Sequence, residues 1–222
     1  MSTNEKSPEI RLDEDQVKWA ASVGRRRHSE SEKRKKRQSD GSRDANALPN
    51  HIRGAIAELA LSNFLNEPWQ ATVNAYNDFP DLNGYLECRG KKSGQPFLRI
   101  YKKDEKAQKG HSIFVSVTRL KDDGNARTNF EDDEWVVRHL ADFRIDGWIV
   151  GKDAMKSEFW TYNEQYKRSE WQVPVSVLQP PSTLGKELDV RLRLLEKGRQ
   201  KLRDWMAAGL EARALKAEQK GR

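Results

Sequence analysis

The sequence feature that most constrains the fold is a short polar stretch near the middle of the chain, PDLNGYLECR at residues 80–89. Its Asn-Gly pair is typical of a tight turn between two strands, so we expect a β-hairpin here. Side chains alternate along a strand, which places Glu87 and Arg89 on one face and Cys88 on the other. Together with Asp81, which precedes the turn, the hairpin brings two carboxylates and a cation into a small space.

The length of the turn decides where Asp81 points. A two-residue turn directs Asp81 away from the face that carries Glu87, and Asp78 then becomes the reserve carboxylate. A three-residue turn that begins at Leu82 pairs Asp81 with Tyr85 and brings it to the Glu87 face. The sequence leaves both turns open.

An apolar helix predicted over residues 50–66 carries a third carboxylate. Glu58 lies there among alanines and leucines, where burying an unpaired charge would cost on the order of several kcal/mol. Gly54 in the same helix would let another backbone approach closely. A hard metal such as Mg²⁺ takes oxygen ligands, so Glu58, Asp81 and Glu87 are candidate site residues. The alternative is that Glu58 lies on the helix surface.

The chain divides into three zones of different composition. Residues 1–47 form a polar, basic arm with a helix that begins near Asp13, and residues 48–182 form an α/β core. Residues 183–222 read as one amphipathic helix that either docks on the core or makes a homodimer contact. The strand-like segments of the core are 71–76, 85–91, 97–102, 111–117, 143–150 and 171–178.

Composition excludes several classes of protein. No apolar run approaches the roughly 18 residues of a membrane span and no signal peptide is visible, so we expect a soluble, cytoplasmic protein with no membrane partner. The single cysteine, Cys88, excludes an intrachain disulfide, and the four histidines show no zinc-ligand spacing. The net charge of +7 is permissive for a nucleic-acid partner.

Basic residues gather on the N-terminal arm. They predict a contact with DNA phosphates that is independent of base sequence, assisted by Lys91 from the strand after the turn. A solvated helix face is the alternative. The predicted phosphate-binding residues of the arm are Arg25, Arg26, Arg27, Lys33, Arg34, Lys35, Lys36 and Arg37.

Several short motifs follow one another in a particular order and spacing. They are Gly54-Ala-Ile-Ala-Glu58, Pro80-Asp81, Glu87-Cys-Arg89, Gly147-Trp-Ile149, Val173-Pro174 and Leu178-Gln-Pro180. Together they resemble the PD-(D/E)XK nuclease superfamily, whose fold is restriction-endonuclease-like and Holliday-resolvase-like, and in particular its small phage and prophage members. The resemblance covers about residues 48–184.

The resemblance implies an α/β fold with a restriction-endonuclease-like central mixed sheet flanked by helices, and here with helical N- and C-terminal extensions. It also implies a DNA endonuclease that depends on Mg²⁺ or Mn²⁺. Asp81 and Glu87 would hold the metal and Glu58 would support the site from its helix. Such a site activates a water for attack on a phosphodiester and stabilises the charge that develops.

The chain departs from the family pattern at Arg89, where the family has Lys. An arginine stays protonated and cannot act as a base, but it can clamp a phosphate through two parallel hydrogen bonds. An amine base would have to come from Lys91, Lys102 or Lys103. Two other interpretations therefore remain: a nuclease-fold DNA-binding protein that has lost catalysis, and a phage-encoded interaction protein that recruits a partner through its C-terminal helix.

Overall fold

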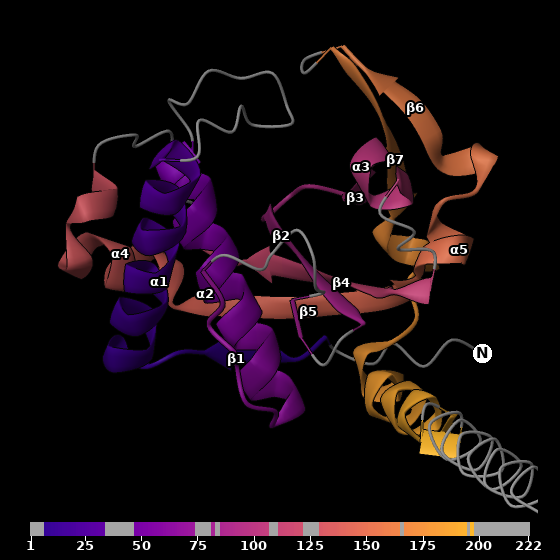
Figure 1. Ribbon diagram of the computed structural model, residues 1–222, viewed down its shortest axis with the longest axis horizontal. Helices are drawn as coiled ribbons and strands as arrows, with labels where there is room; N and C mark the ends of the chain where they lie inside the picture. Colours follow the sequence, from indigo (N-terminus) through magenta and orange to yellow (C-terminus); the bar gives the residue numbers. More distant parts are fainter. Residues whose placement is uncertain are drawn as a thin grey trace, which may run out of the picture. The chain divides into compact units, whose positions relative to one another are not determined.

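The structure, a computed structural model, describes residues 7–33, 47–73, 81–82, 85–106, 111–121, 129–164, 167–194 and 196–197 (Figure 1). The chain forms two compact units, Met1–Pro181 and Ser182–Arg222. The strands of the first unit are β1 (Glu9–Arg11), β2 (Leu86–Lys92), β3 (Phe97–Tyr101), β4 (Ile113–Arg119), β5 (Asp142–Val150), β6 (Trp160–Asn163) and β7 (Arg168–Pro174). Its helices are α1 (Glu14–Lys33), α2 (Ala47–Leu65), α3 (Lys102–Lys106), α4 (Asp133–Leu140) and α5 (Gly151–Ala154).

The strands form two sheets. Four strands in the order β1-β5-β4-β2 make a mixed sheet, in which β2 runs parallel to β4 and the other neighbours are antiparallel. The remaining strands form an antiparallel sheet in the order β3-β7-β6. The predicted α/β class with a mixed sheet and flanking helices is therefore confirmed. The second sheet and the N-terminal strand β1 were not foreseen.

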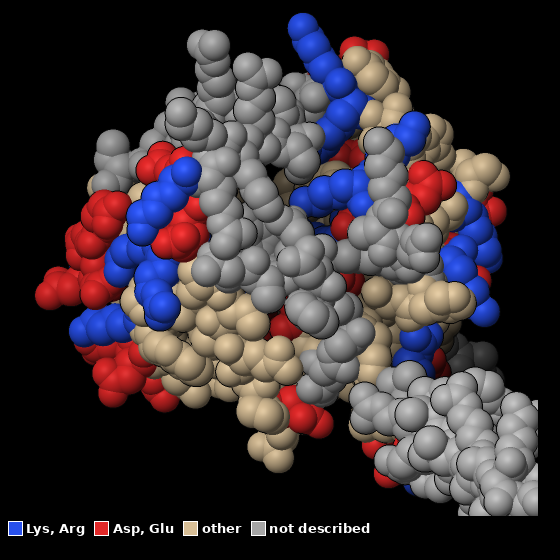
Figure 2. Space-filling view, in the orientation of Figure 1, with Lys and Arg blue, Asp and Glu red and all other residues tan. Residues whose placement is uncertain are grey.

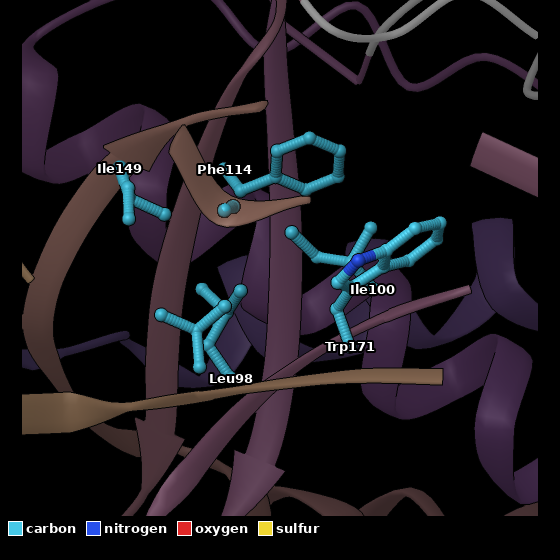
Figure 3. Close-up of a cluster of buried hydrophobic side chains, with 7 residues drawn as sticks. Leu98, Ile100, Phe114, Ile149 and Trp171 are labelled. Carbon is cyan, nitrogen blue, oxygen red and sulfur yellow. The ribbon is translucent and has the colours of Figure 1, made fainter. Parts of the chain in front are cut away.

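A cluster of apolar side chains joins the two sheets. Leu98, Ile100 and Trp171 come from the antiparallel sheet, and Phe114 and Ile149 come from the mixed sheet (Figure 3). Trp171 is the most exposed of the labelled residues from the antiparallel sheet, at 5%. Burial of large apolar side chains contributes roughly 1.5–3 kcal/mol each, so this cluster fixes the antiparallel sheet against the mixed one.

Helices α1 and α2 lie side by side on one face of the mixed sheet (Figure 1). The buried side chains of α2 include Ile52, Ile56 and Leu59, which recur at the spacing of one helix face. Ala57 packs against β2, because its Cβ lies 3.3 Å from the position that a Cβ on Gly90 would take. The predicted helix over 50–66 and the helix expected from near Asp13 are both present.

The two helices cross most closely at Gly24 of α1. A Cβ on Gly24 would lie 2.5 Å from Ile52 Cα and 2.9 Å from His51 O, which is closer than real Cβ contacts. The sequence predicted a close backbone approach at Gly54 instead, and that prediction is wrong. A Cβ on Gly54 would meet no described atom within 4 Å.

Two of the short sequence motifs meet in the structure at Gly147. Its φ of +153° and the 2.5 Å that would separate a Cβ from Gln179 O both exclude a larger residue. The next residue, Trp148, exchanges two backbone hydrogen bonds with Gln179, of 3.0 and 2.8 Å. Its indole Nε1 donates to Pro180 O at 3.1 Å. The segment after β7 is thus bound to β5 by backbone contacts.

Three local predictions are changed by the structure. The pairing expected from either predicted turn is absent, because Leu82 pairs with Leu86 in an isolated bridge; residues 83–84 lie outside the described residues. Residues 71–73 are not in a strand, and the rest of the strand predicted over 71–76 lies outside the described residues. The C-terminal helix is present over 184–194 and at 196–197, and its predicted continuation lies outside the described residues.

Among the described residues, no helix is both long and apolar enough to cross a membrane.

The helix crossing predicts opposite effects for two Gly-to-Ala substitutions. We expect Gly24→Ala to lower the free energy of unfolding by about 1–3 kcal/mol, because a methyl group overpacks the contact with Ile52. Gly54→Ala is the matched control and should raise it by about 0.5–1 kcal/mol, because alanine favours a helix interior. Urea denaturation of both variants measures the two values. Equal changes for the two variants would contradict the close crossing at Gly24.

Candidate functional site

The candidate site lies on the face of β2 opposite α2. Glu87, Arg89 and Lys91 alternate along that face, and Gly90, on the other face, packs against α2. Parallel pairing places Glu87 beside Phe114 and Arg89 beside Ser116 of β4. Glu87 is only 1% exposed. The strand therefore presents a row of charges to the interior, where unpaired charges are costly.

Arg89 brings two carboxylates together. Its Nη2 lies 3.3 Å from Glu87 Oε2 and 3.0 Å from Asp104 Oδ1. Its guanidinium also lies 5.1 Å from the centre of the Phe114 ring. Asp104 is 2% exposed and is held from behind by the backbone N–H of Tyr101, which donates to Oδ2 at 2.9 Å. Sequence reasoning missed Asp104, since it lies in a run of charged residues, KKDEK, that reads as surface.

Asp81 lies at the edge of β2. The backbone N–H of Cys88 donates to Asp81 Oδ2 at 2.7 Å. Backbone N–H groups lie in the plane of a sheet, so the Asp81 carboxylate lies beside the strand rather than across the sheet on the α2 face. Asp81 and Glu87 are each one residue beyond the bridge between Leu82 and Leu86. This pairing brings Asp81 close to Glu87 in register, and neither predicted turn gives that pairing.

The negative charges of Asp104, Glu87 and Asp81 stabilise the protonated form of Arg89. Burial opposes its charge, but the negative charges of Asp104, Glu87 and Asp81 more than offset that cost and raise the pKa of Arg89 above its ordinary value. The same surroundings act on Cys88, where burial first and the charge of Asp81 next raise the pKa of the thiol. Cys88 is therefore a neutral buried side chain.

Lys91 points to a second polar cluster farther along the strand. Its Nζ lies 3.0 Å from Asp146 Oδ2 and donates to Gln95 O at 2.6 Å. Asp146 is the residue that the β4–β5 register skips, because Ser116 pairs with Gly147 and the next residue of β4 pairs with Ile145. A bulge of this kind redirects a side chain. Asp146 Oδ2 also accepts hydrogen bonds from Ser116 Oγ at 2.9 Å and Thr118 Oγ1 at 2.6 Å.

Glu58 lies on the other side of the mixed sheet, on α2, in a separate buried pair. Arg27 of α1 donates to it through both ends of its guanidinium, with distances of 2.6 Å to Oε1 and 2.7 Å to Oε2. The indole of Trp69 donates to Oε2 at 3.1 Å, and Arg27 Nε donates to Thr72 O at 2.7 Å. Glu58 and Arg27 are 6% and 5% exposed. In this arrangement Glu58 ties α2 to α1, and Arg27 is not presented to a phosphate in solvent.

The remaining basic residues of the arm differ in their surroundings. Arg25 binds Phe130 O and Asp133 Oδ1, with Nη2 distances of 2.9 and 2.7 Å, and so attaches α1 to the start of α4. Arg26 and Lys33 are exposed, and Lys33 Nζ lies 3.0 Å from Glu30. The predicted contacts Arg34, Lys35, Lys36 and Arg37 lie outside the described residues.

Comparison with protein-family models, with curated proteins and with solved structures finds no match. Within the described ranges, no three His, Cys, Asp or Glu side chains gather as a metal-binding group. Mg²⁺ is usually held by one or two carboxylates plus waters and substrate phosphates. Two carboxylates would therefore be enough to hold such an ion.

The buried pair of α1 and α2 predicts a large loss of stability when one partner is removed. Arg27→Met should lower the free energy of unfolding by about 3–5 kcal/mol, because it leaves the Glu58 carboxylate buried without its cation. The double variant Arg27→Met/Glu58→Leu should recover much of that loss. Arg26→Met, one residue away and exposed, is the control and should change stability by about 0.5 kcal/mol or less. Chemical denaturation measures all three, and equal losses at Arg26 and Arg27 would contradict this role.

The Asp146 cluster predicts a dependence of stability on pH. Burial raises the pKa of Asp146, but hydrogen bonds from Thr118, Lys91 and Arg144 outweigh it and hold the pKa below 3.8. The stabilisation by the ionised carboxylate is therefore complete above the unfolded-state pKa and is lost as the pH falls through the lower folded-state pKa. Below about pH 4, unfolding free energies should fall more steeply for wild type than for Asp146→Asn. Parallel curves from urea denaturation would refute this.

Proposed function

We propose that this protein is a metal-dependent endonuclease-like protein that hydrolyses phosphodiester bonds in DNA, with a restriction-endonuclease-like core. The observation that carries the proposal is the convergence of Glu87 and Asp104 on Arg89 at one end of β2, where Asp81 accepts the backbone N–H of Cys88. Carboxylates gathered beside one arginine on a strand of a mixed sheet provide both oxygen ligands and a phosphate-binding cation. The basic composition of the chain supports DNA as the substrate.

The donor set fits a hard divalent ion such as Mg²⁺ or Mn²⁺. Asp81 and Glu87 remain the proposed ligands, and Asp104 lies 3.0 Å from Arg89 on its other side. Glu87 and Asp104 together carry more charge than the one arginine between them, so the local charge is negative and favours an added cation. When bound, the ion would supply an activated water and stabilise the charge on the phosphate.

Arg89 is proposed to bind the scissile phosphate. Its Nη2 already joins Glu87 to Asp104, and its buried Nε has no hydrogen-bond partner among the described residues. Lys91 is an unsuitable base, because its ammonium is held by Asp146. Lys102 Nζ lies 6.0 Å from the centroid of the Trp160 ring, and Lys103 Nζ lies 5.8 Å from the centroid of the Tyr101 ring. Glu58, on the α2 face, is assigned a structural role in this proposal.

One observation favours the alternative of a DNA-binding protein without catalysis. Arg89 lies between the two carboxylates at a distance suited to hydrogen bonds, and a protonated arginine there neutralises the charge that would attract a metal. A metal has to compete with this internal cation for Glu87. The alternative and the first proposal therefore differ in whether any metal produces cleavage.

Plasmid cleavage tests the proposal. With Mg²⁺ or Mn²⁺ the protein should nick supercoiled plasmid, and EDTA should stop it. Glu87→Gln should reduce nicking to background. Asp104→Asn should slow it by about 10–100-fold, because Arg89 loses the carboxylate that orients it. Agarose-gel assays measure the rates, and circular dichroism confirms that each variant is folded.

Glu105→Gln is the matched control for Asp104→Asn. Glu105 is the next residue of α3 and is exposed, so its loss should leave the nicking rate unchanged. If no metal produces nicking while DNA shows a salt-sensitive mobility shift, the catalytic proposal is wrong and the binding alternative stands.

A further inference from the structure

Strand β6 exposes two aromatic rings on one of its faces. Trp160 is 37% exposed and Tyr162 is 53% exposed. They are two residues apart, so their side chains leave the strand on the same side. β6 is an outer strand of the antiparallel sheet. Large aromatic residues at neighbouring exposed positions offer an extended flat surface to a ligand.

The ring of Trp160 is held in place by its neighbours. It meets the buried ring of Trp171 nearly edge-on, with 4.3 Å between ring centroids and an interplanar angle of 60°. Helix α3 is also close to this ring: Lys102 Nζ lies 6.0 Å from the centroid of the Trp160 ring. A ring that is already fixed loses little conformational freedom when a ligand stacks on it.

This aromatic surface adjoins the candidate site through two connections. The ring of Trp160 contacts Trp171, which belongs with Phe114 to the apolar cluster of Figure 3, and the guanidinium of Arg89 lies 5.1 Å from the Phe114 ring. In addition, the five-residue helix α3 carries both Lys102, beside Trp160, and Asp104, which is 3.0 Å from Arg89. The aromatic pair and Arg89 are therefore both next to α3.

The segments around the aromatic pair carry a positive charge. Residues 97–106 and 156–168 together contain seven Lys and Arg against four Asp and Glu, and one of those acids, Asp104, is paired with Arg89. On the face shown in Figure 2, Lys and Arg side chains are visible over this part of the molecule. Cations interspersed with aromatic rings are typical of surfaces that bind single-stranded nucleic acid.

We infer that Trp160 and Tyr162 form a stacking platform for unpaired bases, and that single-stranded DNA is the substrate class of the site at Arg89. The cleavage of single-stranded DNA rests on the proposed function, whereas the stacking of bases on the two rings does not. The two residues lie about 6.6 Å apart along the strand, roughly twice the 3.4 Å rise of stacked bases in a duplex. One base on each ring therefore requires a strand whose bases are separated, and paired bases in a duplex do not expose their faces.

Binding of a fluorescein-labelled oligothymidylate tests the platform. The full-length protein is titrated in EDTA, so that no cleavage occurs, and anisotropy gives the Kd. Trp160→Ala and Tyr162→Ala should each weaken binding about 5- to 150-fold, because each stacked base contributes about 1–3 kcal/mol and 1.4 kcal/mol is tenfold. Trp160→Phe keeps an aromatic ring and should restore most of the affinity.

Trp19→Ala is the matched control. Trp19 is 48% exposed and meets a buried ring edge-on, that of Trp69, with 4.9 Å between centroids and an angle of 74°. Its substitution should leave the Kd unchanged. Equal weakening by Trp19→Ala and Trp160→Ala, unchanged affinity in both β6 variants, or equally tight binding of a matched duplex would overturn the platform. Ring-dependent binding by a protein that cuts no DNA would support the platform and contradict only the nuclease.

Discussion

Buried carboxylates and the cations that reach them from other elements are the constraint on which this structure depends. Among the described residues, the buried acids are Glu58, Glu87, Asp104, Asp146 and Glu170. Burial of a carboxylate without a partner is costly enough to unfold a domain of ordinary stability. Each of these acids accordingly lies next to a cation, and most of the pairs join two different elements: α2 to α1, α3 to β2, β5 to β2, and β7 to β3.

The two sides of β2 use this constraint for different purposes. On the α2 side, Arg27 forms a bidentate pair with Glu58 and adds a bond to Thr72 O, so that the guanidinium is largely satisfied internally. Such a pair specifies how α1 and α2 meet. On the opposite side, one Nη2 of Arg89 serves two carboxylates, while its Nε has no partner within the described residues. Unused hydrogen-bonding capacity lies at Arg89, and this is why we place the chemistry there and not at Glu58.

The sequence predicted the elements better than it predicted their contacts. Apolar periodicity located α2, and alternation located β2, β3 and β5, because local patterns determine such elements directly. The turn after Asp81 was misjudged because Tyr85 N and Leu86 N both bond to Leu82 O, a closure that depends on neighbouring strands. Glu58 was correctly expected to be buried, yet its partner Arg27 lies 31 residues away in a run that looked like a solvated surface. Ion pairs of this range have no local signature.

The presence of an arginine rather than a lysine at position 89 has a consequence for how the site is held together. A lysine at position 89 would present a compact charge on a flexible stem and could give up its proton when buried. Arg89 stays protonated, and its planar head lies between Glu87 and Asp104 and over Phe114. It therefore links β2 to α3 at every ordinary pH. α3 follows β3 directly and also carries Lys102, whose Nζ lies 6.0 Å from the ring centroid of Trp160 on β6. A positioning role of this kind suits arginine better than lysine, and it depends on Asp104 as well as on Glu87.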